Sequence, residues 1–256
     1  MLVVISPAKR LDWDMAQEDV RPPAFQADAN ALAARMRELS LEELQSLMGL
    51  SDALARLNRD RFAEMADAPD AANSRPAAWA FAGDTYQGLE AATLEPDAVA
   101  YAEDHLRILS GLYGVLRPRD AIQPYRLEMG ARLETPRGRD LYAFWGERIA
   151  GRLAADAEAA GSEALVNCAS QEYFRAVDTD RLGLRVVTPQ FYDMKGGVPK
   201  IVSFHAKKAR GAMARFVCEH RPTAPAHLEA FDAGGYRHAP ELSEPDRPAF
   251  LRGEAG

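Results

Sequence analysis

Short runs of apolar, often β-branched residues recur along the chain and predict strands. These predicted strands cover Leu2–Ile5, Ala78–Tyr86, Ala164–Asn167, Leu184–Pro189 and Lys200–Ala206. Between them lie longer stretches in which apolar residues recur at helical spacing. Strands and helices therefore alternate, which predicts an α/β fold with a mixed or mostly parallel sheet and helices packed on it.

Helix signals are strongest in the first quarter of the chain. Ser40, followed three residues later by Glu43, forms a capping box for a helix that begins near Leu41. Gly49 ends that helix, and Ser51 caps the next one. Further helices are predicted over 98–115, over Leu141–Ala160 and from about Lys207 to Glu219.

No repeat or linker divides the chain, so residues 1–256 are predicted to form a single domain with an inserted helical lobe. Residues 240–256 are polar and rich in proline, which predicts a loose tail. No apolar run reaches the roughly 18 residues of a membrane-spanning helix, and the N-terminus lacks a secretory signal. Cys168 and Cys218 lie in apolar contexts, which is typical of reduced core cysteines in a cytoplasmic protein. We therefore expect no membrane partner.

Charge is unevenly distributed along a chain whose net charge is −7. Between Lys195 and Arg221, seven basic residues face Glu219 alone, and between Arg107 and Arg139 seven arginines face three carboxylates. A locally basic surface on an acidic body suits an anionic partner. The same asymmetry is also common in soluble enzymes.

The helix predicted from Lys207 carries the densest group of basic residues. One side holds Ala209, Ala212, Met213 and Phe216, and the other holds Lys207, Lys208 and Arg215, with Gly211 among them and Arg210 on a flank. Lysines at a helix start, with Gly211 admitting a ligand backbone, make a plausible anion cradle. The solvated face of an ordinary helix explains the same pattern.

Polar residues follow three of the predicted strands. Ser6 and Lys9 follow the first strand. Ser170 and Glu172 follow the strand that ends at Asn167, and Lys207 follows the last strand. If these strands are parallel, the three loops converge on one crevice. Such a group suits a phosphate or nucleotide, and Glu172 or a lysine could act as an acid–base group. Ser170 and Asn167 could equally be helix caps without a function.

Two other segments offer weaker candidates. Arg126 and Glu128 share a face of an extended segment, either as an internal ion pair or with Arg126 free for a phosphate. Gly111 and Gly114 indicate close packing rather than a phosphate loop, because no strand is predicted to lead into them.

The segment from Ser40 to Arg61 has the plan of a helix-hairpin-helix, whose N–H groups hold a DNA phosphate without reading bases. Gly49 is a single glycine where two are common, and ordinary helical hairpins look the same. Three arginines in the segment are opposed by four carboxylates.

Taken together, these segments resemble the YaaA peroxide stress protein family. The matching segments are ISPAK (5–9), LMGLSDALARLN (47–58), FAGDTYQGL (81–89), LSGLYGVLRPRDAIQPYRLEMG (109–130), DLYAFWG (140–146), LVNCASQEYF (165–174) and SFHAKKARGAMARF (203–216). The chain departs from the family pattern at Arg10, Cys168 and His205, where threonine, leucine and tyrosine are usual.

The resemblance implies a cytoplasmic bacterial protein that resists hydrogen peroxide and limits damage by free iron. It also implies an unusual α/β fold that contains a helix-hairpin-helix and a positively charged cleft, and that binds duplex or branched DNA. The residues expected to contact DNA phosphates are Gly49, Ser51, Arg126, Lys207, Lys208, Arg210 and Arg215.

Two other functions remain open at this point. One is an enzyme that acts on a nucleotide or nucleobase, possibly in DNA, with Lys9, Ser170, Glu172 and Lys207 forming the pocket. The other is direct iron binding, which the five scattered histidines and the lack of cysteine clusters argue against. We predict no metal site and no cofactor.

Overall fold

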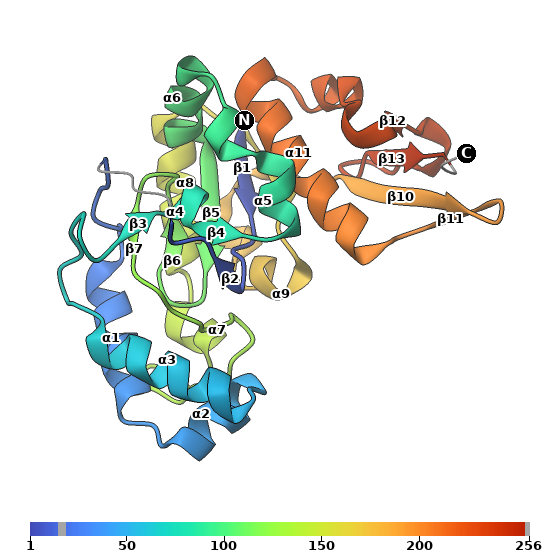
Figure 1. Cartoon of the computed structure of the whole chain (residues 1–256). Helices are drawn as coiled ribbons and strands as arrows, with labels where there is room; N and C mark the ends of the chain where they lie inside the picture. The colour runs from blue at the N-terminus through green and yellow to red at the C-terminus, as the bar shows by residue number, and fades with distance from the viewer. Residues whose placement is uncertain (15–18, 254–256) are drawn as a thin grey trace.

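A five-stranded sheet forms the centre of the computed structural model, which describes residues 1–14 and 19–253 (Figure 1). Its strand order is β6-β5-β1-β8-β9. The strands are β1 (Leu2–Ile5), β5 (Leu106–Ser110), β6 (Gly114–Leu116), β8 (Ala164–Cys168) and β9 (Arg185–Val187). All neighbours are parallel except β5 and β6. Every residue of β1, β5 and β8 is buried, as expected for a parallel sheet covered on both faces.

A second sheet lies beside the first and has the order β11-β10-β13-β12. Its strands are β10 (Gln190–Lys195), β11 (Val198–Lys200), β12 (Tyr236–His238) and β13 (Ala249–Arg252). Two short ribbons pair β2 (Arg10–Leu11) with β4 (Phe81–Ala82) and β3 (Arg75–Pro76) with β7 (Ala121–Ile122). One continuous apolar cluster includes residues of both larger sheets.

Helices cover the central sheet and form a lobe at one end of the molecule (Figure 1). The lobe consists of α1 (Gln26–Arg37), α2 (Leu41–Met48) and α3 (Asp52–Glu64). The longer helices around the sheet are α6 (Pro96–His105), α8 (Arg148–Ala159) and α11 (Ser203–His220). The shorter ones are α4 (Ala77–Ala80), α5 (Asp84–Leu89), α7 (Leu141–Trp145), α9 (Gln171–Phe174) and α10 (Thr179–Leu182). Short 3-10 helices cover Ala91–Thr93, Pro225–Ala230, Ala233–Gly235 and Pro240–Leu242.

The predicted fold class and the predicted caps are confirmed. The fold is mixed α/β, and β1 and β8 are parallel neighbours. Ser40 and Glu43 form the capping box of α2, which ends at Gly49 in the left-handed region with a φ of 61°. The Ser51 side chain caps α3.

Three predicted elements were wrong. Lys200–Ala206 is not a strand, because α11 begins at Ser203 and buries Ala206. Ala78–Tyr86 is a turn of helix, a two-residue strand and the start of α5. The helix predicted over 98–115 ends at His105 and is followed by β5. The two predicted strands are short apolar runs, and periodicity alone does not separate a strand from a helix in such runs. In 98–115, β5 follows α6 directly, so no turn signal separates the two elements.

Two smaller predictions also need correction. The helix predicted over Leu141–Ala160 is divided by Gly146, whose φ of 48° ends α7 before α8 begins. The predicted loose tail contains β13, which lies between β10 and β12 with Ala249 and Phe250 fully buried. A strand of four residues between prolines and charged residues is too short for its hydrophobic pattern to be recognised in the sequence. Residues 254–256 of that tail lie outside the described residues.

No helix in the described ranges is long and apolar enough to cross a membrane.

Candidate functional site

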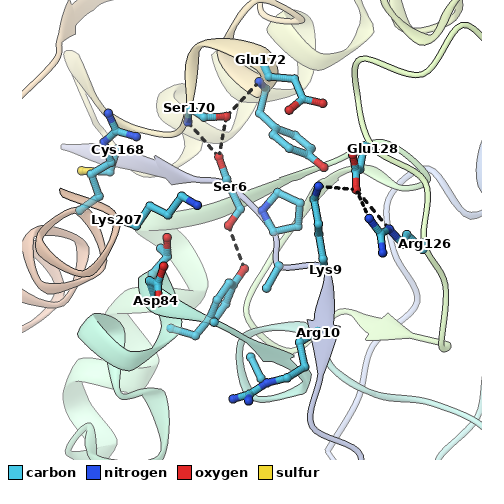
Figure 2. A pocket seen from close by; sticks show the side chains of 18 of the residues that line it. Ser6, Lys9, Arg10, Asp84, Arg126, Glu128, Cys168, Ser170, Glu172 and Lys207 are labelled. Atoms are coloured by element: carbon cyan, nitrogen blue, oxygen red, sulfur yellow. Dashed lines mark hydrogen bonds and ion pairs between the residues drawn. The ribbon is translucent and has the colours of Figure 1, made fainter. Parts of the chain in front are cut away.

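The strand-end pocket is a cavity of about 480 Å³ at the carboxyl ends of β1 and β8 (Figure 2). The loop after β1, the loop after β8, the start of α5, the segment 125–128 and α11 contribute its walls. In open α/β sheets this edge, next to the central strand, is where ligands bind. The predicted convergence of Lys9, Ser170, Glu172 and Lys207 is therefore present, although Lys207 comes from a helix rather than from a strand end.

The hydroxyl groups of the pocket hold its two loops together. The backbone N–H of Ser170 donates to Oγ of Ser6 at 2.9 Å, and the two hydroxyls lie 3.3 Å apart. Oγ of Ser170 also accepts the N–H of Tyr173 and caps α9, while Tyr86 donates to the Ser6 carbonyl. Ser170 thus has the structural role of a cap, and no general base among the described residues is hydrogen-bonded to either hydroxyl.

Two of the three carboxylates that line the pocket are also engaged. Glu172 Oε1 accepts the backbone N–H of Gly130 at 2.9 Å. Glu128 Oε1 lies 2.9 Å from Nζ of Lys9 and 3.1 Å from Nη2 of Arg126. Of the two alternatives left open for Arg126, the ion pair with Glu128 is therefore present, and a DNA contact by Arg126 stays a prediction. These contacts hold Glu128 and Glu172 in place at the edge of the pocket. That the protein is an enzyme acting on a nucleotide stays a prediction.

Cations outnumber carboxylates in the lining of the strand-end pocket. The cations are Lys9, Arg10, Arg126, Lys207 and Arg210, and the carboxylates are Asp84, Glu128 and Glu172. Lys207 points from α11 into the pocket (Figure 2). Among the described residues, no carboxylate lies within 4.0 Å of the charged groups of Arg10, Lys207 or Arg210. Their charge is therefore available to an anionic ligand.

The basic residues of α11, which were predicted to form one surface, lie on two different sides of the helix. Lys207 and Arg210 line the strand-end pocket, whereas Lys208 and Arg215 line a second cavity on another side of the helix. Arg215 donates to the carbonyls of Leu89 and Glu90 and to Thr93, and pairs with Glu219. Its guanidinium thus anchors the end of α5, and a DNA contact by Arg215 stays a prediction.

Gly211 serves packing rather than ligand access. A Cβ atom there would lie 1.7 Å from the Thr85 carbonyl oxygen, because the backbone of α5 crosses α11 at this point. The sequence predicts that a ligand backbone approaches Gly211 closely. In the structure, the backbone of α5 occupies that position instead. Gly111, which follows strand β5, packs in the same manner against the Leu127 carbonyl. The prediction that no strand leads into Gly111 was wrong, whereas close packing there is confirmed.

All five lysines of the chain lie in the strand-end pocket, on α11 or on the hairpin before it. They are Lys9, Lys195, Lys200, Lys207 and Lys208. Most ion pairs of the described residues use arginine instead. Arginine suits fixed, bidentate pairs and lysine acts as a mobile point charge, so this concentration favours binding of an anion near α11.

The predicted helix-hairpin-helix is an ordinary-looking helical hairpin in the α1–α3 lobe (Figure 1). Two of its three arginines are in ion pairs, since Arg56 pairs with Asp52 at 2.8 Å and Arg59 with Asp60 at 3.1 Å. Gly49 and Ser51 form the turn as expected, but a phosphate contact there stays a prediction.

Both cysteines are buried, and Cys168 lines the strand-end pocket. Burial raises the pKa of the Cys168 thiol to about 12, and burial likewise raises the pKa of Cys218 to about 12. Peroxide oxidises the thiolate of accessible cysteines with a low pKa. These two are the chain's only cysteines, and the raised pKa values keep both as thiols at neutral pH.

Some lining residues were not selected from the sequence. Arg10 and Asp84 line the pocket, as do Tyr86 and Tyr125. Arg10 directly follows Lys9 and could have been included on that ground. The other three reach the pocket only through tertiary packing, which no local pattern reveals.

Comparison with known proteins identifies the family. A sequence model described as "Peroxide stress protein YaaA" matches residues 1–242. The chain belongs to the YaaA family. It is 63% identical over 252 residues to a UPF0246 protein of Ruegeria pomeroyi, with 98% of each chain covered. It is also 61% identical over 254 residues to a UPF0246 protein of Roseobacter denitrificans, with 98% of each covered. A Jannaschia UPF0246 protein is 59% identical over 255 residues, which is 100% of this chain and 98% of that one. Membership of the YaaA family supports a role in peroxide stress.

Proposed function

We propose that this YaaA-family protein acts in the peroxide stress response by binding DNA through the strand-end pocket and the adjoining face of α11. The observation that carries the proposal is the set of cations there without carboxylate partners, Arg10, Lys207 and Arg210. DNA offers a regular row of phosphates to such cations, and lysine and arginine contacts to phosphates supply most of the affinity of non-specific DNA binding.

The contacts envisaged are to phosphates. Lys207 and Arg210 lie one turn apart on α11, and the same pocket is lined by Lys9, in the loop after β1, and by Arg10, at the start of β2. Phosphate contacts position a protein on DNA and carry no sequence information. A cavity of about 480 Å³ is also large enough to admit one nucleotide. We therefore expect binding without sequence preference, to duplex or branched DNA. Gly49 and Ser51 in the hairpin would form a second, weaker contact.

The proposal is tested by the salt dependence of DNA binding. We expect the double variant Lys207→Gln/Arg210→Gln to bind a labelled duplex more weakly, because two phosphate contacts are lost. The slope of log K against log salt should become shallower by about 1.8, at roughly 0.9 for each contact. Fluorescence anisotropy across a salt series measures both quantities.

A charge-matched control separates a local from a general effect. Arg181→Gln/Arg237→Gln removes the same charge from exposed positions outside the pocket. This control should keep the wild-type slope to within a few tenths. Equal losses in both double variants would contradict a phosphate site at α11.

A further inference from the structure

Exposed apolar side chains gather where α11 begins. Among the described residues, the exposed large hydrophobic side chains are Leu54 and Leu57 on α3, and Val198, Ile201 and Phe204. The last three fall within seven residues, and Phe204 has the largest exposed fraction at 57%. Folding does not require an exposed phenylalanine, and a group of such residues marks an interaction site.

The surroundings of this apolar patch are basic. No aspartate or glutamate occurs between Asp193 and Glu219. Lys200 lies between Val198 and Ile201 in the chain. Lys207 and Lys208 lie three and four residues beyond Phe204, on its two flanks, so that Lys207 lines the strand-end pocket and Lys208 the second cavity. Within the part of the chain that the structure describes, none of these three lysines is in an ion pair.

We propose that Phe204, with Ile201 beside it, stacks against a DNA base at an unpaired or opened step, while Lys200, Lys207 and Lys208 hold the flanking phosphates. The inference rests on the proposed function and adds to it a preference for DNA with accessible bases. An aromatic ring among cations is the usual arrangement for single-stranded nucleic acid, because every base offers a face for stacking. Apolar side chains also wedge between base steps in kinked duplexes.

Continuity with the strand-end pocket favours DNA as the partner. Lys207 lines that pocket and lies one helical turn from Phe204, so one strand can reach both. A two-fold contact with a second copy would bring the same lysines against each other, which like charges oppose. A membrane-surface helix needs a long apolar face, but α11 buries its own against the protein, including Ala209, Met213 and Val217.

The test compares Phe204→Ala with wild type on two labelled oligonucleotides, a perfect duplex and one with a single unpaired 2-aminopurine. For the bulged probe we expect affinity to fall about tenfold or more, from the loss of one stacking contact. The salt slope should stay unchanged because no charge is removed. The 2-aminopurine fluorescence change on binding should be lost in the same variant.

Two further variants make the result specific. Phe204→Trp keeps a stacking ring and should restore affinity, whereas Leu57→Ala removes an apolar side chain on α3 that is 44% exposed and should have no effect. The stacking role would be overturned if Phe204→Ala bound the bulged probe with the affinity and the fluorescence change of the wild-type protein. The proposed function would remain intact in that case, provided that wild-type binding weakens with salt. Failure of the wild-type protein to bind either probe would overturn both. Loss of binding to anionic lipid vesicles in Phe204→Ala, with DNA binding unaltered, would assign the patch to a membrane instead.

Discussion

At the scale of single residues, Asp120 shows how strongly the interior acts on a charged group. Its side chain is 4% exposed and accepts the N–H of Arg117 at 2.8 Å. Burial raises the pKa of this carboxyl to about 7, despite the hydrogen bond and the nearby Arg117 and Arg107. Burial also raises the pKa of neighbouring Glu103.

We expect Asp120→Asn to flatten the pH dependence of stability. An unfolded aspartate titrates near pH ~3.9, so between about pH 4 and 7 the native state keeps a proton that the unfolded state has lost. The stabilisation from this group is therefore complete below about pH 4 and is lost as pH rises towards 7. The amide keeps an oxygen for Arg117 and has no charge to bury. Above pH 7 the variant should be the more stable protein, by up to roughly 4 kcal/mol.

Urea unfolding at pH 5 and pH 8 measures this difference. Asp232→Asn, at a carboxylate whose side chain is 70% exposed, is the control and should follow wild type at both values. An Asp120→Asn curve parallel to wild type from pH 5 to 8 would show that the carboxyl is already ionised.

At the scale of elements, the contact between α5 and α11 is the closest helix packing that involves the strand-end pocket. Two glycines make it possible. A Cβ atom on Gly88 would lie 1.9 Å from the Lys208 carbonyl oxygen, and one on Gly211 would lie 1.7 Å from the Thr85 carbonyl oxygen. Both obstructions are backbone, which cannot rotate away. The position of Lys207 over the pocket therefore depends on this contact.

Gly211→Ala should destabilise the protein by about 2 kcal/mol or more, because the helices must separate to admit a methyl group. The matched control is Gly151→Ala in α8, where a Cβ atom meets nothing within 4 Å. That substitution should stabilise the protein by about 0.5–1 kcal/mol through helix propensity. Thermal unfolding of both variants measures the two effects. Similar shifts of the melting temperature in the same direction would contradict the packing role of Gly211.

The elements also show what sequence can predict. The caps at Ser40, Gly49 and Ser51 were predictable because each depends on residues within one helical turn. The start of α11 was not, because Ile201 and Phe204 complete an apolar run that resembles a strand although both are exposed. Only tertiary structure reveals that these side chains do not enter the core.

At the scale of the whole molecule, topology brings together residues far apart in the sequence. The parallel pairing of β1 with β8 places Ser6 against Ser170, 164 positions away. The convergence of those two loops could be predicted from strand order. The division of the α11 cations between two cavities could not be predicted, because a helical wheel does not show which parts of the protein pack against each side of the helix.

The distribution of lysine allows a direct test of the central claim, that the pocket and the adjoining face of α11 bind DNA. Acetylation of lysines, followed by mass spectrometry, reports the accessibility of each of the five residues in the free and the DNA-bound protein. With a duplex present at low salt, we predict that Lys9 and Lys207 become protected and that the protection disappears at high salt. DNA binding that leaves both lysines as reactive as in the free protein would contradict the account.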